Sequence, residues 1–282
     1  MYVAERDGAQ SLAPGSSWRD VGGLCQGRSM NKSQPENLRG RTFQSRTLRE
    51  SRFIGCDLGD VVVRGSEVAG MEIDSPWLLE GGSRLLVNGV DVVPLVDAEL
   101  SRRFPGRELR GSEDAEGLRA AWTAIERTWA ATLDRAVAMP PGTVDAPVDD
   151  EWSVAQTLRH LVMATDTWLG KAILERDQPY HRAGLPNDDN DTEAYDVSVF
   201  SAVTPSFVEV LAARADRQTM VRDFLAGVTS QELAVRRKNP HATQHPETVL
   251  SCLRTILEEE WEHHRYAVRD LDALAEAHST SV

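Results

Sequence analysis

From residue 113 onward, apolar residues recur among polar ones with the period of an α-helix. Four segments show this pattern, and they cover residues 113–138, 152–176, 204–227 and 246–276. In the first, Leu118, Trp122 and Ile125 share one face of the predicted helix. The third begins with Thr204 as a helix cap and Pro205 at the first helical position. Four long amphipathic helices in about 165 residues predict a four-helix bundle.

A different period appears upstream, where every fifth residue from 38 to 73 is large and apolar. These residues are Leu38, Phe43, Leu48, Phe53, Leu58, Val63, Val68 and Ile73. A period of five fits neither a helix nor a half-buried strand, but it fits a solenoid with one inward residue per repeat. Residues 36–75 resemble the pentapeptide-repeat family, which implies a short right-handed β-helix with room for about two coils. Downstream, Asn88-Gly89 predicts a turn between two short strands that extend this unit.

These patterns divide the chain into three parts. Residues 1–35 are rich in Gly, Ser and charged residues and predict a disordered leader, with order beginning near Met30. The pentapeptide-like β-helix and its strand extension cover 36–106, and the bundle covers 113–276. We therefore expect a mainly α protein with a small β part.

Composition and charge exclude several classes of partner. No segment approaches the roughly 18 to 20 apolar residues that span a bilayer, so no membrane partner is expected. Residues 1–110 carry equal numbers of basic and acidic side chains, so the net charge of −13 lies entirely in residues 111–282. This acidic excess argues against nucleic-acid binding. Three scattered cysteines, Cys25, Cys56 and Cys252, form no disulfide framework and favour the cytoplasm.

The last predicted helix carries unexpected polar residues in "EEEWEHHRYAVRDL", residues 258–271. Its apolar seam consists of Leu250, Leu253, Leu257, Glu260, His264, Ala267, Leu271 and Leu274. Glu260 and His264 therefore fall on the buried stripe, whereas Glu258, Glu259, Glu262 and His263 are expected on the surface. A buried carboxylate needs a partner. Spacing alone leaves two alternatives, a buried Glu–His hydrogen bond and a metal site.

A third polar residue favours the metal. His160 lies at the edge of the apolar face of the second predicted helix, within "TLRHLVMATDTW". If the bundle packs this helix against the last one, His160, Glu260 and His264 supply two imidazoles and one carboxylate. Such a set suits a catalytic divalent ion with an open coordination position.

Two motifs carry a family resemblance. "EWSVAQTLRHL", residues 151–161, followed by "EEEWEHHRYAVRDL", resembles the DinB-like superfamily of metal-binding four-helix bundles over about residues 113–275. Members have one His on the second helix and a paired motif on the last, whose second His precedes an Arg, here Arg265. The resemblance implies metal ligands at His160, Glu260 and His264, as in the mycothiol-dependent maleylpyruvate isomerase branch. It also implies zinc or nickel as the metal and mycothiol or another low-molecular-weight thiol as a cosubstrate.

The leading hypothesis is a cytoplasmic metal-dependent thiol S-transferase, isomerase or hydrolase that takes a small-molecule electrophile or thiol. The alternative is a non-catalytic metal-binding scaffold that docks a partner through the pentapeptide-like segment. DNA mimicry is disfavoured because that segment is short and carries no acidic excess. The family resemblance implies a homodimer. The long segment 177–203, which contains His181, is predicted to be a binding loop or lid.

Overall fold

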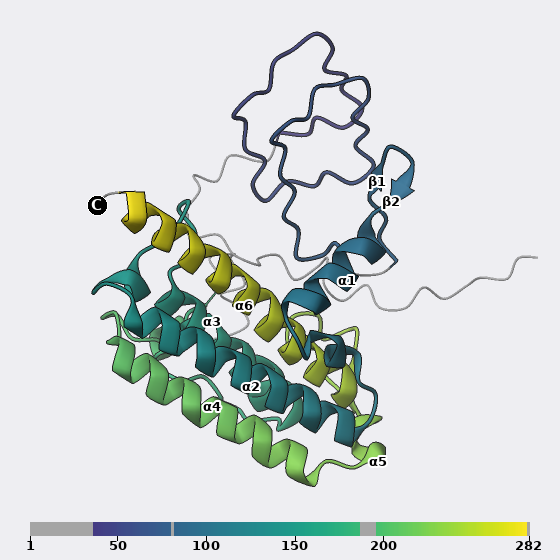
Figure 1. The fold of residues 1–282 in the computed structure, drawn as a ribbon. Helices are drawn as coiled ribbons and strands as arrows, with labels where there is room; N and C mark the ends of the chain where they lie inside the picture. The colour runs from purple at the N-terminus through teal and green to yellow at the C-terminus, as the bar shows by residue number, and fades with distance from the viewer. Residues whose placement is uncertain (1–35, 80–81, 187–195, 281–282) are drawn as a thin grey trace, which may run out of the picture.

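The computed structural model describes residues 36–79, 82–186 and 196–280. Four long helices dominate it and lie side by side as a bundle (Figure 1). They are α2 (Ala115–Ala138), α3 (Val154–Thr165) with its continuation η3 (Asp166–Ile173), α4 (Phe207–Gly227) and α6 (Val249–Thr280). The mainly helical bundle predicted from the hydrophobic pattern is confirmed.

Shorter elements connect and flank the bundle. Before it come β1 (Leu86–Val87), β2 (Val90–Asp91), α1 (Val93–Arg103) and η1 (Arg107–Gly111). Between its helices lie η2 (Thr143–Asp145), η4 (Val197–Val199), α5 (Ser230–Leu233), β3 (Arg236–Arg237) and β4 (Glu247–Thr248). β1 pairs antiparallel with β2, and β3 pairs antiparallel with β4. Asn88 and Gly89 both have positive φ at the β1–β2 turn, as the Asn-Gly prediction requires.

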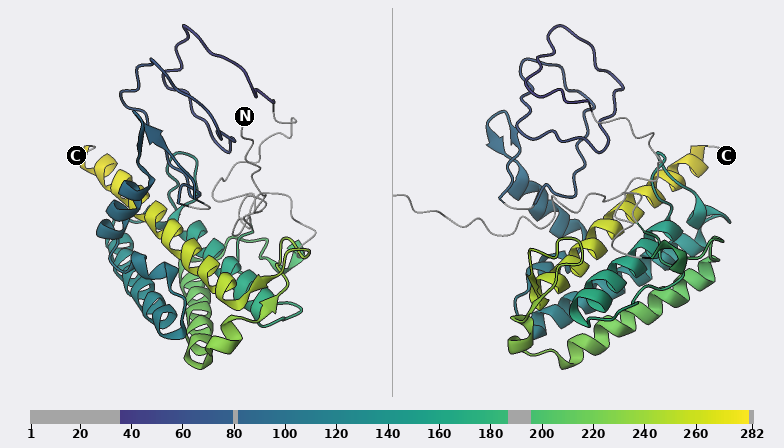
Figure 2. Two further views of the ribbon diagram at one scale, coloured as in Figure 1. Left: turned by 90° about the vertical axis from the view of Figure 1, so that its right-hand side faces the viewer. Right: turned by 180° about the vertical axis from the view of Figure 1, so that it is seen from behind.

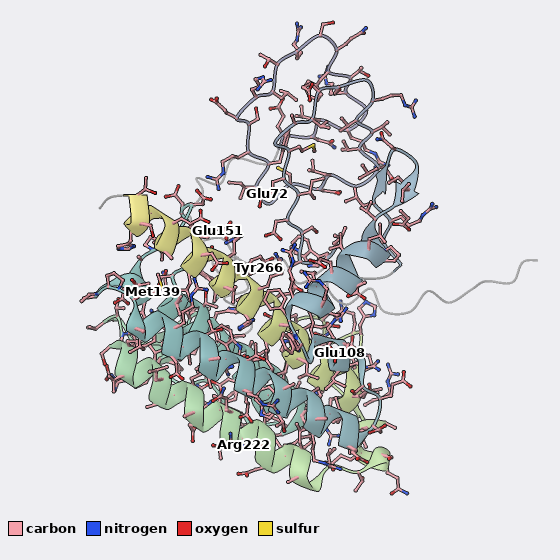
Figure 3. All side chains as sticks on the ribbon, viewed as in Figure 1. Glu72, Glu108, Met139, Glu151, Arg222 and Tyr266 are labelled. Atoms are coloured by element: carbon pink, nitrogen blue, oxygen red, sulfur yellow. The ribbon has the colours of Figure 1, made fainter. Side chains whose placement is uncertain are left out.

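The bundle core is rich in tryptophan. α3 packs against α4 and α6, and α2 packs against the same two helices. Side chains fill the space between the helices (Figure 3). Trp122, Trp129 and Trp261 are each at most 2% exposed. Because an aromatic side chain of this size removes a large apolar area from water, these residues contribute much of the bundle's stability.

Side-chain caps define where the bundle helices begin. Ser153 and Gln156 form a reciprocal capping box at the start of α3, and Ser206 and Glu209 form another at the start of α4. The predicted cap of α4 at Thr204 is therefore wrong by two residues. A serine hydroxyl followed three positions later by Glu satisfies two backbone N–H groups at once, which explains why Ser206 is the cap.

The second bundle helix is not a uniform α-helix. From Asp166 its backbone continues as the π-helix η3, in which Leu174 N donates to Leu169 O. π-helical turns are uncommon and are frequent near functional sites. This change of period rotates the side chains of η3 relative to those of α3, which carries His160.

The expected β-helix is not shown. In residues 36–79 the backbone turns every five residues, with positive φ at positions 40, 45, 50, 55, 60, 65 and 70. Every second turn has a backbone hydrogen bond, from Arg41 N to Leu38 O, Ser51 N to Leu48 O, Val61 N to Leu58 O and Met71 N to Val68 O. No strand is assigned in this segment, however, and the eight apolar side chains at period five are 46% to 62% exposed. The segment winds beside the bundle (Figure 2). Two coils leave every layer at an open end, so no apolar layer is covered on both sides.

Ion pairs connect this segment to the bundle. Asp74 bonds to Arg265 at 2.7 Å and contacts Arg269 at 3.3 Å, both on α6. The predicted disordered leader and part of the predicted lid, residues 187–195, lie outside the described residues. Within the described ranges, no helix is both long and apolar enough to cross a membrane.

Candidate metal centre

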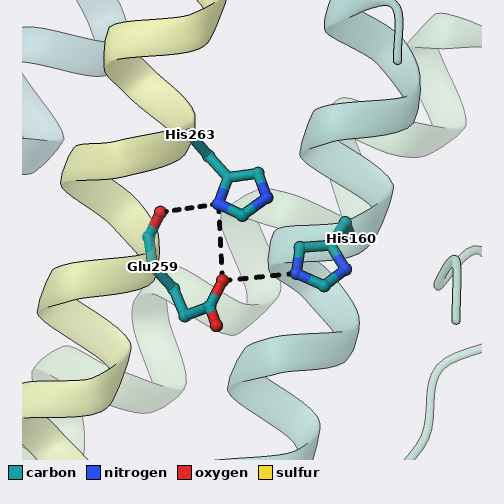
Figure 4. Close-up of side chains that lie close together, drawn as sticks. All are labelled: His160, Glu259 and His263. Carbon is teal, nitrogen blue, oxygen red and sulfur yellow. Dashed lines mark hydrogen bonds and ion pairs between the residues drawn. The ribbon is translucent and has the colours of Figure 1, made fainter. Parts of the chain in front are cut away.

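Two neighbouring helices bring three potential metal ligands together inside the bundle. His160 comes from α3, and Glu259 and His263 come from α6 (Figure 4). His160 Nε2 lies 3.3 Å from Glu259 Oε2. One donor atom from each of the three residues lies within 4.8 Å of the others. The cluster thus offers two imidazole nitrogens and one carboxylate oxygen at a single point.

The spacing of four along α6 places Glu259 and His263 one turn apart. His263 Nδ1 lies 2.9 Å from the backbone O of Glu259 and 3.4 Å from its Oε2. A proton on Nδ1 satisfies that backbone carbonyl, which leaves the lone pair of His263 on Nε2. A backbone carbonyl commonly fixes the tautomer of a metal-binding histidine in this way.

The cluster is buried and has an aromatic wall. His160, Glu259 and His263 are 5%, 8% and 0% exposed. The two imidazoles stack with their centroids 4.6 Å apart, and the ring of Trp152 lies 4.9 Å from His160 and 6.2 Å from His263. Trp152 directly precedes Ser153, the cap of α3. The turn that begins α3 therefore also holds the Trp152 ring beside the two imidazoles.

Electrostatics favour a cation at this point. Burial raises the pKa of Glu259, but the hydrogen bond from His160 and the nearby imidazoles outweigh burial and hold its pKa below the usual value. Burial lowers the pKa of His263 to about 4, so this imidazole is neutral at pH 7. The pocket therefore holds a carboxylate beside a neutral base, and a buried carboxylate is costly without a positive partner.

These residues fit a divalent metal ion. Two histidines and one glutamate form a donor set found in catalytic zinc sites, with one position left for water or substrate. Donors bound to one zinc ion at about 2.0 to 2.2 Å are separated by roughly 3.3 Å at the tetrahedral angle. The separation between His160 Nε2 and Glu259 Oε2 has this value.

The structure does not bring Glu260 and His264, the two expected α6 ligands, to His160. Glu260 is 1% exposed and forms an ion pair with Arg214 of α4. Burial raises the pKa of Glu260 in spite of that pairing. His264 Nε2 lies 2.8 Å from the hydroxyl of Thr132 on α2, and its ring packs edge-on against Trp129. The candidate ligand set is therefore corrected to His160, Glu259 and His263.

The physical reason for this correction is that α6 is buried on two faces. One face, with Glu260 and His264, packs on α2 and α4, and the other, with Glu259 and His263, packs on α3. The prediction assumed one narrow apolar stripe, so it placed Glu259 and His263 on the surface, which is wrong. The repeated spacing of four within "EEEWEHH" was the one signal for the second pair.

A known protein family matches the part of the chain that contains the candidate metal centre. A sequence model of the DinB superfamily matches residues 124–267, which is more than half of the chain. The chain belongs to the DinB superfamily. The match runs from α2 to α6 and includes all three residues of the candidate centre. Neither curated proteins nor solved structures provide a match to this chain.

In this DinB superfamily protein, the described part of the predicted lid is tied to the helix that carries His160. Arg159 Nε donates to Ala183 O at 3.0 Å, and His181 N donates to the Asp166 carboxylate at 2.8 Å. A Cβ on Gly170 would lie 2.7 Å from Pro179, so only glycine allows this approach. Sequence reasoning missed Asp166, whose pKa burial raises to about 6 despite its pairing with Arg217.

The two described cysteines lie apart from this cluster. Cys252 is fully buried on α6, and burial raises its pKa to about 12, so it is a neutral thiol at pH 7. Cys56 lies in the exposed N-terminal segment. Neither side chain belongs to the group of donors around Glu259.

Proposed function

We propose that this DinB superfamily protein binds a divalent metal ion through His160, Glu259 and His263 and uses it to transfer a low-molecular-weight thiol to an electrophile. The observation that carries the proposal is the buried carboxylate of Glu259 between two imidazoles, one of which is neutral at pH 7. Imidazole and carboxylate donors suit zinc and nickel. When bound, such an ion lowers the pKa of a coordinated thiol or water at neutral pH.

The protein's own residues have distinct roles in this proposal. Glu259 compensates part of the cation's charge, and the backbone carbonyl of Glu259 fixes the ring of His263. Trp152 covers the imidazoles and keeps water from that side. Burial of all three donors lowers the local dielectric and so strengthens their hold on a cation.

The reaction class is the one that the family resemblance implies, in which a low-molecular-weight thiol is the cosubstrate. The thiol cosubstrate gives its proton to water, its sulfur forms a bond to an electrophilic carbon, and the bond from that carbon to the leaving group breaks so that the leaving group departs with the bonding electrons. Mycothiol, bacillithiol and glutathione are the cosubstrates to test. Isomerase and hydrolase activities use the same centre and differ in what occupies the open position.

The direct test is a thiol-transfer assay on untagged protein loaded with Zn²⁺ or Ni²⁺. Each of the three thiols is paired with monochlorobimane or 1-chloro-2,4-dinitrobenzene. We expect at least one thiol to react faster with the electrophile in the presence of metal-loaded wild-type protein than in its absence. We expect His160→Ala and Glu259→Gln to lose that acceleration. His278→Ala is the matched control because His278 is exposed near the end of α6. Metal-loaded protein that accelerates none of these reactions would contradict the transferase proposal.

That negative result would favour the second candidate function, a non-catalytic metal-binding scaffold. One observation supports this alternative. The period-five apolar side chains of residues 36–79 are exposed, and contiguous exposed apolar surface often marks an interaction site. Under this alternative the metal stabilises the bundle and the N-terminal segment docks a partner.

A further inference from the structure

A tight turn at the start of α3 covers the candidate metal centre with a tryptophan. Glu151 N donates to Val148 O at 2.8 Å and closes this turn. Asp149 and Asp150 within it are exposed, whereas Trp152, at its end, is 6% exposed. The ring of Trp152 lies against the imidazoles of both candidate histidine ligands. On this side of the bundle, one aromatic ring therefore separates an exposed turn from the buried donors.

The backbone of this turn is strained. Asp149 and Asp150 are consecutive residues in the left-handed region, with φ of 52° and 63°. This conformation is unfavourable for a residue with a Cβ, and it persists only where surrounding contacts hold it. Such residues cluster at ligand clamps and switch regions. Contacts from outside the turn are thus needed to keep Trp152 over the imidazoles.

The N-terminal segment, residues 36–79, supplies those contacts. Arg52 Nη2 donates to the backbone O of Asp149 at 3.5 Å, and its Nη1 lies 3.7 Å from the Asp149 carboxylate. Glu151 forms an ion pair with Arg269 of α6. Arg269 in turn lies 3.3 Å from the carboxylate of Asp74. The segment therefore reaches the turn twice, directly through Arg52 and indirectly through Arg269.

We propose that residues 148–152 form a gate, which opens to let a metal ion or a small thiol reach the three donors, and that the N-terminal segment is the strap that holds this gate closed. The side chains of Glu151 and Arg269 are 28% and 33% exposed. Partly exposed ion pairs are weak, so the turn can open while α3 and α6 stay packed together. This proposal rests on the proposed metal site, and it gives the N-terminal segment a role in controlling access to that site.

The test measures the rate of zinc exchange rather than turnover. Untagged protein is loaded with Zn²⁺, and the release of zinc to the chelator 4-(2-pyridylazo)resorcinol is followed by absorbance. Uptake of Zn²⁺ by metal-free protein is measured in the same way. A gate that covers the filled and the empty site alike changes both rates by the same factor and leaves the affinity unchanged. A residue that only stabilises the bound ion changes the affinity instead.

We expect Trp152→Ala to release and take up zinc about tenfold faster, because aromatic contacts of this kind are worth up to about that factor. Trp152→Phe keeps a ring and should restore part of the slow exchange. Asp74→Asn should raise both rates about two- to fivefold, the range that a partly exposed ion pair supplies. Asp272→Asn is the matched control and should exchange zinc like wild type. It removes the same charge, but from an exposed ion pair with Arg135 that does not include the turn.

Trp152→Ala that exchanges zinc as slowly as wild type would overturn the gate and leave the metal site intact. Faster release matched by an equal loss of affinity would also overturn it, because Trp152 would then only stabilise the ion. Asp74→Asn that exchanges zinc no faster than Asp272→Asn would overturn the strap. This variant lies outside the bundle core, so it tests the proposal even if Trp152→Ala does not fold. Wild-type protein that binds no Zn²⁺ would refute the metal site and the gate together.

Discussion

His160 Nε2 lies 3.3 Å from Glu259 Oε2, although 99 positions separate the two residues in the chain. The contact joins α3 to α6, so it exists only when these two helices are docked. An ion held by both helices binds the folded state and not the unfolded chain. Metal binding should therefore raise the free energy of unfolding, in proportion to the logarithm of the metal concentration.

The ion pair between Arg214 and Glu260 should behave as a structural pair. Both side chains are at most 2% exposed. Removing one partner from a buried pair leaves an uncompensated charge and typically costs about 3 to 5 kcal/mol. We expect Arg214→Met or Glu260→Leu alone to lower the free energy of unfolding by this amount, measured by urea denaturation.

The double variant Arg214→Met/Glu260→Leu supplies the control, because apolar replacement of both partners is often neutral. It should be more stable than either single variant. If the losses of the two single variants simply add in a double-mutant cycle, the residues are not coupled and this account of Glu260 is wrong.

His264 should make the metal-free bundle sensitive to acid. Burial lowers its pKa from the usual 6.5 to about 4. Between pH 6.5 and 4, His264 is protonated in the unfolded chain but neutral in the folded state. The free energy of unfolding therefore falls as the pH drops toward 4. The difference is on the order of 3 kcal/mol. His264→Gln should reduce this loss by that amount, measured by urea denaturation of metal-free protein at pH 7, 5.5 and 4.

The other titrating groups, including His263 and Asp166, are common to both proteins and cancel in the comparison. His278→Ala, at an exposed position, should follow the wild-type curve. If the free energy of unfolding depends on pH in the same way for wild type and His264→Gln, burial does not lower the pKa of His264 and this account of His264 is wrong.

The cap of α3 should contribute measurably to stability. The Ser153 hydroxyl accepts from Gln156 N at 3.4 Å, and Gln156 Oε1 accepts from Ser153 N at 2.9 Å. Replacing a serine cap with alanine costs about 1 kcal/mol. We expect Ser153→Ala to lose this amount in urea denaturation, and we expect Ser153→Thr to lose less because it keeps the hydroxyl. An alanine variant as stable as wild type would contradict the capping role.

Much of the bundle was predictable from hydrophobic spacing, because long amphipathic helices have a strong and regular pattern. Leu118, Trp122 and Ile125 share the predicted face and are all buried. The resemblance to the DinB-like superfamily is confirmed by the family match at residues 124–267. The π-helical turn at Asp166 was not predictable, because a local change from α to π spacing depends on packing rather than on an amphipathic period.

The candidate centre was predicted only in part. His160 was identified because it lies at the edge of the apolar face of the second predicted helix, where it can join a polar pair on the last helix. The partners on α6 were placed one residue too late, because two adjacent pairs, Glu259–His263 and Glu260–His264, have the same spacing. Only the three-dimensional packing of α6 between α2 and α3 tells these pairs apart. In the segment with apolar residues at every fifth position, the repeat predicted the spacing of the backbone turns. It did not predict how the side chains pack, and no β-helix is shown.

The metal content of matched variants tests the central claim most directly. Protein purified without a metal-affinity step is supplied with Zn²⁺ or Ni²⁺, dialysed, and measured by inductively coupled plasma mass spectrometry. The adjacent substitutions His263→Gln and His264→Gln form the decisive pair, together with His160→Ala and Glu259→Gln. We predict about one ion per chain in wild type and His264→Gln, and loss of the ion in the other three. No stoichiometric ion in wild type, or an ion that His264→Gln loses and His263→Gln keeps, would contradict the account.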